Sequence, residues 1–220
     1  MLSKKNILIT GATGLIGTAI VKSLMRNASI DYDIYAIGRN RERARKRFQT
    51  YKDNKHFHFI QHDVTEELKS KTNFHYIIHA ASNASPSFFS KYPVDIMRSN
   101  IDGTLNLLDY GRKHNMERFL YVSSGEIYGE GDGRVFTEDY LGYVNTNSAR
   151  SCYPMAKRAA ETLCAAYASQ YGIEYVIARP SHTYGADFTD EDNRVFAQFI
   201  RNVLNDEDII MKSSGTQYRS

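Results

Sequence analysis

The chain has 220 residues, with 28 Lys and Arg against 25 Asp and Glu, and 42% of its residues are hydrophobic. This composition can bury a core and excludes a disordered tail, and 14 Gly with four Pro exclude a collagen-like chain. Two Cys are too few to staple a domain of this size, which favours a reducing compartment. No apolar run approaches the roughly 20 residues of a membrane span, so we expect a cytoplasmic protein without a membrane partner, built as one large domain or one and a half ordinary ones.

Short apolar runs alternate with longer helical patterns along the chain. The expected strands are 6–10, 33–38, 56–61, 74–80, 118–123 and 174–179. The expected helices are 15–26, 41–51, 94–114 and 153–171, and the polar, glycine-bearing stretch 129–147 is expected to be a long loop. Continuous apolar strands that alternate with helices predict an α/β fold, a doubly wound parallel sheet of the Rossmann type.

The first expected strand runs directly into a glycine-rich turn, Gly11-Ala-Thr-Gly14-Leu-Ile-Gly17, and then into a helix. The first glycine allows a sharp turn, the second brings the backbone close to a pyrophosphate, and the third lets the helix pack tightly on the strand. The helix start adds free N–H groups and a positive dipole end. A glycine pattern alone can be a plain tight turn, so its place between strand and helix is what predicts dinucleotide binding.

Basic residues gather after the second expected strand. Residues 39–55 hold eight basic and two acidic residues, a local charge of +6 on a chain whose net charge is +3. Gly38 stands where an acid would bind a ribose 2′-hydroxyl, and Arg39, Arg41 and Arg43 follow it, which favours the 2′-phosphate of NADP. The alternative is a solvated basic helix face. Nucleic-acid binding is not expected, because no base-reading motif or interleaved aromatic cluster accompanies the patch.

Tyr153-Pro-Met-Ala-Lys157 opens a long helix, so both side chains lie on one face. Tyrosine is a poor base at neutral pH, but a neighbouring ammonium and an oxidised nicotinamide would stabilise its phenolate and lower its pKa. Such a base suits removal of a proton from a sugar hydroxyl while hydride leaves the same carbon. Ser123 and Ser124 end the fifth expected strand, in the crevice where open α/β sheets bind ligands.

Other polar residues carry weaker signals. Asp63 and Val64 follow the third expected strand and suit contact with an adenine amino group, although Asp63 could instead cap a helix. No metal site is expected, because the Cys and His residues lack convergent spacing; these are Cys152, Cys164, His56, His58 and His62.

Together these motifs resemble the extended short-chain dehydrogenase/reductase family, the nucleotide-sugar epimerases and dehydratases. The matching segments are Thr10–Gly17, His79–Ser82, the Ser-Asn-Ile-Asp-Gly-Thr run that contains Asn100, Ser123–Gly129, Tyr153–Lys157 and Arg179–Gly185. Segments 79–86, 103–108, 138–145 and 150–164 are most similar to the UDP-glucuronate decarboxylases within that family. The resemblance also implies a homodimer formed through helices 94–114 and 153–171.

The resemblance implies a reaction on a nucleotide sugar. Tyr153 would take the 4-hydroxyl proton while C4 gives hydride to the cofactor, and the resulting 4-keto acid would lose CO2 before the hydride is returned. Dehydratases of this family carry an Asp-Glu pair and decarboxylases a Ser-Glu pair, whereas here Gly125 precedes Glu126. The missing dehydration acid favours decarboxylation. The alternatives are a 4-epimerase, a 4,6-dehydratase or a non-catalytic NAD(P)-binding module, with Glu126 as a carboxylate that bonds the backbone.

The resemblance and the motifs together assign the site. The expected catalytic residues are Ser124, Glu126, Tyr153 and Lys157. The expected cofactor contacts are Gly11, Thr13, Gly14, Leu15, Ile16, Gly17, Arg39, Arg43, Asp63, Val64, Ala80, Ala81, Ser82, Asn100, Ser123, Tyr153, Lys157 and Pro180. The expected substrate contacts are Ser85, Ser124, Glu126, His182 and Arg219.

Some positions depart from the family pattern. His182 stands where the family often has Asn, and Gly185-Ala-Asp187 stands where it has Gly-Pro-Arg. Gly38 and Arg39 replace the acidic residue usual in NAD-holding decarboxylases, so the cofactor is expected to be NAD or NADP. We expect a dinucleotide-binding domain at 1–180 and the start of a smaller substrate lobe at 181–220, apparently truncated by comparison with the family.

Overall fold

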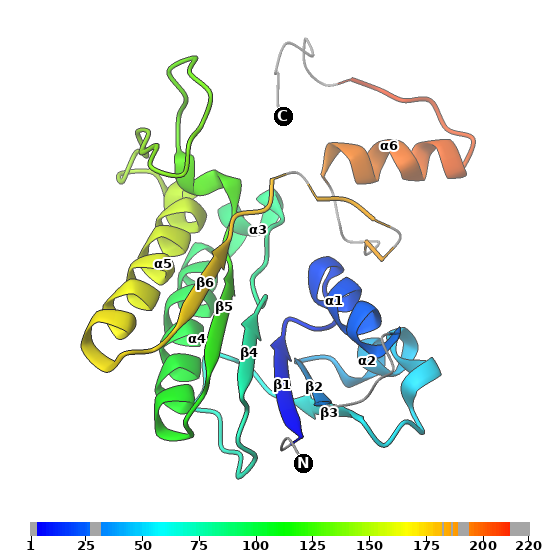
Figure 1. Ribbon diagram of the computed structural model, residues 1–220. Helices are drawn as coiled ribbons and strands as arrows, with labels where there is room; N and C mark the ends of the chain where they lie inside the picture. The colour runs from blue at the N-terminus through cyan, green and yellow to red at the C-terminus, as the bar shows by residue number, and fades with distance from the viewer. Residues whose placement is uncertain (1–3, 27–31, 182, 186, 189–193, 212–220) are drawn as a thin grey trace.

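The computed structural model describes residues 4–26, 32–181, 183–185, 187–188 and 194–211 (Figure 1). Its centre is one parallel sheet in the order β3-β2-β1-β4-β5-β6. The strands are β1 (Lys5–Thr10), β2 (Tyr32–Gly38), β3 (Phe57–Gln61), β4 (Tyr76–His79), β5 (Arg118–Val122) and β6 (Tyr175–Ala178). The strand order reverses between β1 and β4, which confirms the doubly wound fold. Open α/β sheets generally bind their ligands at such a point.

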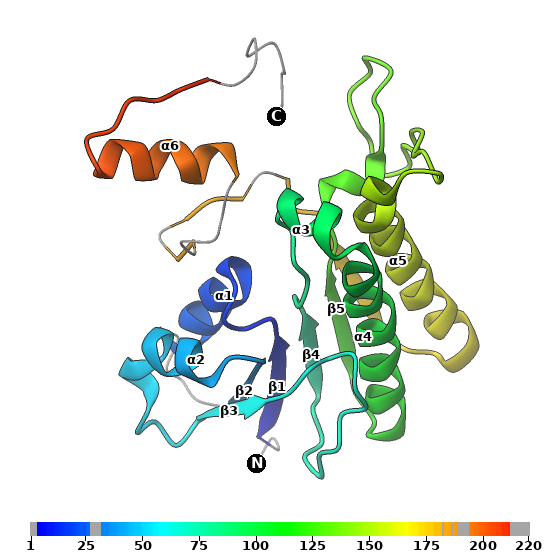
Figure 2. The same ribbon diagram turned by 180° about the vertical axis from the view of Figure 1, so that it is seen from behind.

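Helices cover both faces of the sheet (Figures 1 and 2). On one face lie α1 (Leu15–Arg26) and α2 (Arg41–Arg47); on the other lie α4 (Pro93–Lys113) and α5 (Cys152–Tyr171). The remaining helical segments are α3 (Pro86–Lys91), α6 (Val195–Leu204) and the single turns η1 (Gln49–Tyr51), η2 (Gly125–Tyr128) and η3 (Ala149–Ser151). Because crossovers between parallel strands are almost always right-handed, the helices before the reversal of strand order lie on one face and those after it lie on the other.

The core consists of two layers, one on each face of the sheet. Successive side chains along a strand point to opposite faces, so Leu8 packs toward α4 and α5 while Ile9 packs toward α1 and α2. Both side chains are fully buried. The continuous apolar strands predicted from the sequence are therefore explained by burial on both faces.

The expected helix 41–51 is shorter in the structure. Helix α2 ends at Arg47, and Phe48 turns its ring into the core, where it is 3% exposed. Its backbone leaves the helical region (φ −114°, ψ 20°), and η1 forms a separate turn whose Tyr51 ring contacts Phe57. Burial of two aromatic rings at the end of the basic helix thus stops the helix, which the helical pattern alone did not indicate.

Helix α6 lies beyond the carboxyl ends of the strands (Figure 1). The segment that leads to it is held against the first two helices by Asp187. Lys22 donates to both carboxylate oxygens of Asp187 at 2.8 and 2.9 Å, and Arg47 donates to its backbone carbonyl at 2.7 Å. The expected boundary at residue 180 stays a prediction; β6, the last strand among the described residues, ends at Ala178. Among the described residues, no helix is both long and apolar enough to cross a membrane.

Candidate functional site

The glycine-rich turn lies between β1 and α1, against the end of β4. Gly11 has a left-handed backbone (φ +62°), and a Cβ there would lie 2.5 Å from the carbonyl oxygen of Ala80. A Cβ at Gly17 would lie 2.2 Å from the carbonyl oxygen of Gly11. The physical reasons given for the first and third glycines are therefore confirmed: one makes the turn and the other lets the helix approach it.

Gly11→Ala should weaken both the fold and cofactor binding. The added methyl would meet Ala80 and the left-handed backbone would be strained, so we expect a loss of about 1–3 kcal/mol in unfolding free energy and at least a tenfold loss of NAD affinity. Gly172→Ala is the matched control, because Gly172 has φ +72° but no atom within 4 Å of its Cβ. Urea unfolding and NAD titration measure both effects. Unchanged NAD affinity in Gly11→Ala would contradict the assignment.

The carboxyl ends of β1, β4 and β5 present groups that fit a dinucleotide. Helix α1 begins at Leu15 directly after the turn, so its first N–H groups have no acceptor within the helix. The hydroxyl oxygens of Ser82 and Ser123 are buried and have no partner among the described residues. Buried polar groups are normally paired, so these two hydroxyls indicate a ligand at this edge. The donor set fits a nicotinamide dinucleotide.

Thr10 and His79 fix the loop that faces the glycine-rich turn. The Thr10 hydroxyl lies 2.7 Å from Nδ1 of His79 and accepts a hydrogen bond from the Ala81 N–H at 3.3 Å. Burial, assisted by the charge of Lys157, lowers the pKa of His79 to about 3, so the ring stays neutral. The expected cofactor residues Ala80, Ala81 and Ser82 are thereby held next to Gly11.

Several residues of the basic cluster are paired with acidic residues. Arg45 contacts Glu42 at 2.9 Å, and Arg47 contacts Asp187 at 3.2 Å. Arg39 is exposed and lies 3.6 Å from Asp63, so the two residues expected to contact the cofactor at this end do lie together. Asp63 also accepts from the Thr65 N–H and hydroxyl, which makes it the cap of a turn as well as a candidate adenine contact.

Tyr153 and Lys157 lie on the buried side of α5, under the end of β5. The Lys157 ammonium donates to the carbonyl of Val122 at 2.8 Å and lies 5.7 Å from the centre of the Tyr153 ring. It lies 4.7 Å from the ring centre of Tyr121. Burial lowers the pKa of Lys157 to about 7, with the Glu161 carboxylate acting in the opposite direction. The pair predicted from the sequence is therefore brought together, with the amine in a strongly desolvated place.

The expected lowering of the tyrosine pKa by Lys157 is not found in the fold. Burial raises the pKa of Tyr153, and the Ser124 hydrogen bond and the charges of Arg194 and Arg150 only oppose that rise. The physical reason is that the phenol is 5% exposed, so desolvation of its anion outweighs the nearby charges. A bound oxidised nicotinamide would add the positive charge that this prediction also required.

Ser124 and Glu126 meet Tyr153 at the start of η2. The Ser124 hydroxyl accepts from the Glu126 N–H at 3.2 Å and bonds the Tyr153 phenol. The Glu126 carboxylate pairs with Nη2 of Arg150 at 2.9 and 3.2 Å. Among the described residues, the Glu126 carboxylate thus contacts a guanidinium and no backbone group, which disfavours the alternative in which it bonds the backbone.

An aromatic ring stacks on the Tyr153 side chain. The Phe89 ring of α3 lies 4.6 Å from the Tyr153 ring at an interplanar angle of 17°, and the Arg150 guanidinium lies 4.7 Å from the Phe89 ring centre. Sequence reasoning missed both Phe89 and Arg150 as site residues. Helix α3 has only six residues, too few for a periodic signal.

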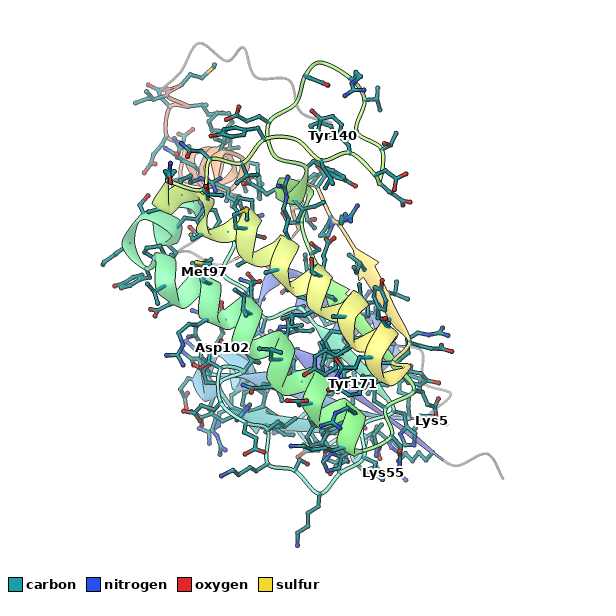
Figure 3. The ribbon with its side chains drawn as sticks, turned by 90° about the vertical axis from the view of Figure 1, so that its left-hand side faces the viewer. Lys5, Lys55, Met97, Asp102, Tyr140 and Tyr171 are labelled. Carbon is teal, nitrogen blue, oxygen red and sulfur yellow. The ribbon has the colours of Figure 1, made fainter. Side chains whose placement is uncertain are left out.

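Two further arginines fix the long loop over the site, and sequence reasoning missed these also. Arg179 is paired with Glu161 at 2.7 Å and donates to the Glu138 carbonyl at 2.7 Å. Arg158 donates to the carbonyls of Ile127 and Gly142 at 2.7 and 2.8 Å. The expected loop 129–147 is confirmed in outline, with one bridge between Glu130 and Tyr143. Figure 3 labels Tyr140 in this loop.

The remaining expected contacts are placed as follows. Asn100 is fully buried in α4, where its side-chain amide donates to the Ile96 carbonyl and accepts a hydrogen bond from the Tyr121 hydroxyl. It would therefore influence the site through Tyr121, whose ring lies next to the Lys157 ammonium. Ser85 precedes α3, and the Pro180 carbonyl accepts from the Gly125 N–H. His182 and Arg219 lie outside the described residues. In the part of the chain that the structure describes, no cluster of His, Cys, Asp or Glu could hold a metal, and Cys152 and Cys164 are buried free thiols.

Comparison with known proteins agrees with this geometry. Residues 7–220 match the family described as the NAD dependent epimerase/dehydratase family. The chain belongs to this family. Its UDP-glucuronic acid decarboxylase relatives confirm the resemblance drawn from the motifs. UDP-glucuronic acid decarboxylase 6 of Arabidopsis thaliana is 38% identical over 99% of this chain, and UDP-glucuronic acid decarboxylase 1 of Danio rerio is 33% identical over 99%.

Solved structures of the family superimpose on the chain. The UDP-glucuronic acid 4-epimerase from Bacillus cereus, in complex with UDP-glucuronic acid and NAD, gives a TM-score of 0.81 at 26% identity, over 96% of this chain and 67% of that one. The chain spans 62% of the length of the Arabidopsis relative and 50% of the Danio relative. The activity of the whole protein is therefore a matter for proposal.

Proposed function

We propose that this chain carries the cofactor site and the catalytic base of an enzyme that decarboxylates UDP-glucuronate through a 4-keto intermediate. The observation that carries the proposal is Glu126, which is held by Arg150 beside the Ser124–Tyr153 pair, with Gly125 where a dehydratase would have its acid. The identity to UDP-glucuronic acid decarboxylases over nearly the whole chain supports the same reaction.

The residues divide the work of the proposed reaction. Tyr153 takes the proton of the sugar 4-hydroxyl, and Ser124, which bonds the phenol, holds the same oxygen. A nicotinamide dinucleotide held by the glycine-rich turn and the ends of β4 and β5 would supply the hydride acceptor for C4 and the donor that gives the hydride back. The C4 ketone makes the sugar a β-keto acid, whose C5–C6 bond breaks to release CO2 and leave an enolate that is then protonated. Lys157 places its amine, which is only partly charged at neutral pH, 5.7 Å from the centre of the Tyr153 ring, and Glu126 faces the adjoining part of the sugar.

The intact protein should convert UDP-glucuronate with NAD into UDP-xylose and CO2. Trapped CO2 and chromatography of the nucleotide sugars measure both products. An epimerised UDP-sugar without CO2 would favour the 4-epimerase, for which the Bacillus cereus epimerase is a structural precedent. Loss of water from the sugar would favour the dehydratase, and nucleotide-sugar binding without any product would leave a non-catalytic NAD(P)-binding module.

We propose that the cofactor is NAD, and that Arg39 also lets the site accept NADP. No acid stands at Gly38 to repel a 2′-phosphate, and the Arg39 guanidinium is 76% exposed beside Asp63. Arg39→Ala should lower NADP affinity about tenfold and leave NAD affinity nearly unchanged, because a charge-assisted hydrogen bond is worth about 1.5–3 kcal/mol. Arg45→Ala is the control, because Arg45 lies on the helix that follows Arg39 and is paired with Glu42.

Removal of Arg43 together with Arg39 should again lower the NADP affinity selectively, and by a larger factor. Titration with both dinucleotides is the measurement. Equal loss of NAD and NADP affinity would count against a 2′-phosphate contact. If NADP then binds no more weakly than NAD, the basic residues are a solvated helix face.

We further propose that the protein is a cytoplasmic homodimer that pairs through the outer faces of α4 and α5 (Figure 3). Apolar side chains that a partner could cover are exposed near the start of α4 and at the end of α5; these are Tyr92, Val94, Met97 and Tyr171. The two buried free thiols support a reducing compartment. The molar mass in solution tests the dimer, and a monomer at micromolar concentration would contradict it.

A further inference from the structure

Arg150 lies between Glu126 and the aromatic stack under the catalytic base. Its Nη2 donates to both carboxylate oxygens of Glu126, at 2.9 and 3.2 Å. Its guanidinium lies 4.7 Å from the centre of the Phe89 ring, and Phe89 in turn stacks on Tyr153 at 4.6 Å. Contacts on two sides therefore fix this cation where the base and Glu126 meet.

The guanidinium has donors left for a ligand. A guanidinium carries five N–H donors in a planar fork that matches a carboxylate. Among the described residues, only Nη2 of the Arg150 side chain makes a hydrogen bond. The side chain is also 46% exposed, so its remaining donors are accessible. Arg150 can therefore bind a second carboxylate while it holds Glu126.

The proposed substrate supplies that second carboxylate. When C4 of the sugar lies at Tyr153, the C6 carboxylate sits on the neighbouring carbon and enters beside Glu126. Two carboxylates at such a short separation repel each other strongly in a partly buried site. A guanidinium shared by both removes the repulsion and adds charge-assisted hydrogen bonds. A neutral hexose carries a hydroxymethyl group there and gains neither.

We propose that Arg150 is the residue that selects a sugar acid over a neutral sugar, by holding the C6 carboxylate and Glu126 on one guanidinium. The inference rests on the proposed function and names the group that recognises its substrate. Arg194 is the other guanidinium that acts on Tyr153, but its contacts with Thr183 and Phe196 place it on the segment that leads into α6. Arg150 is the one that contacts Glu126 directly.

The test compares binding of UDP-glucuronate and UDP-glucose to the intact protein with NAD present, measured by titration calorimetry. Arg150→Met keeps the apolar stem over Phe89 and should lower UDP-glucuronate affinity about 10- to 100-fold, with UDP-glucose affinity changed less than about twofold. Arg150→Lys should recover part of the loss, because an ammonium keeps the charge without the fork. Arg98→Gln, in an exposed pair with Asp102 on α4, is the control and should change neither affinity.

Three results would overturn the proposal: equal loss for both nucleotide sugars, no loss for either, or a selective loss in Arg194→Gln in place of Arg150→Met. If Arg150→Met fails to fold, the Arg150→Lys comparison makes the same decision. Assay of CO2 separates this inference from the proposed function. If wild-type protein prefers UDP-glucuronate but releases no CO2, the decarboxylase proposal fails and the role of Arg150 in selecting the sugar acid is unaffected. If CO2 is released but Arg150→Met keeps the wild-type preference, the decarboxylase proposal holds and the role of Arg150 fails.

Discussion

Tyr153→Phe should lower the turnover of UDP-glucuronate by about 10²–10⁴-fold, the usual contribution of a positioned acid or base. The substitution removes only the phenol oxygen, which bonds Ser124, and keeps the ring that stacks on Phe89 at 4.6 Å. The unfolding free energy should change by no more than about 1 kcal/mol, because one hydrogen bond is lost and the packing is retained. Steady-state CO2 release and urea unfolding measure the two quantities.

Tyr167→Phe is the matched control for this prediction. Tyr167 lies on the same helix, and its hydroxyl donates to Asp109 at 3.0 Å, away from the site. It should lose stability to a similar small extent and keep full turnover. If Tyr153→Phe retains more than about a tenth of the wild-type turnover, Tyr153 is not the base and the mechanism proposed for this site fails.

Local features of the fold were predictable because their causes lie close together in the sequence. The helix expected at 15–26 is α1 with the same bounds, since apolar residues recur at helical spacing there and glycines precede it. The turn at Gly11 and the close helix packing at Gly17 were predicted correctly because a strand–turn–helix context leaves little choice for the backbone. The Tyr153–Lys157 pair was predictable for the same reason, because both residues lie on one helix turn.

Contacts between distant segments were not predictable from these patterns. Phe89 stacks on Tyr153 from a six-residue helix 64 positions earlier in the chain, and Glu126 meets Arg150 across 24 positions. Nothing in residue spacing encodes either contact, because both arise where the loops after parallel strands gather at one edge of the sheet. The end of α2 has a similar cause, since Phe48 leaves the helix to enter the core.

The pKa of Tyr153 is raised in the protein without its cofactor, so the lysine alone does not produce the expected lowering. Spacing shows that a lysine is near but does not show how deeply both groups are buried. In the structure Lys157 is 2% exposed, and burial lowers the pKa of its amine to about 7, so the amine is only partly charged at neutral pH. Desolvation then dominates both members of the pair. Burial thus disfavours the charged form of Lys157, and strongly shifted pKa values of this kind are common at functional sites.

Lys157→Met should therefore stabilise the fold while it removes activity. The pKa of Lys157 is lowered from 10.5 to about 7 on folding, so between those pH values the unfolded chain binds more protons than the folded one. Stability of the wild type rises with pH across this window, by up to about 1.4 kcal/mol per pH unit, and its penalty is largest at and below pH 7. Methionine has a similar length and no charge, so the penalty disappears in the variant.

At pH 7 we expect Lys157→Met to be more stable than wild type by roughly 3 kcal/mol, after the lost hydrogen bond to Val122 is allowed for, and the difference should shrink toward pH 10. Turnover should fall by about 10²-fold or more, because the base loses its nearby charge. Urea unfolding at several pH values measures the first effect. Lys55→Met is the control, since Lys55 is exposed and should show no gain that depends on pH (Figure 3). A pH-independent difference, or a variant less stable at pH 7, would show that Lys157 is not a strained cation and that its charge is accommodated by Val122 and the surrounding rings.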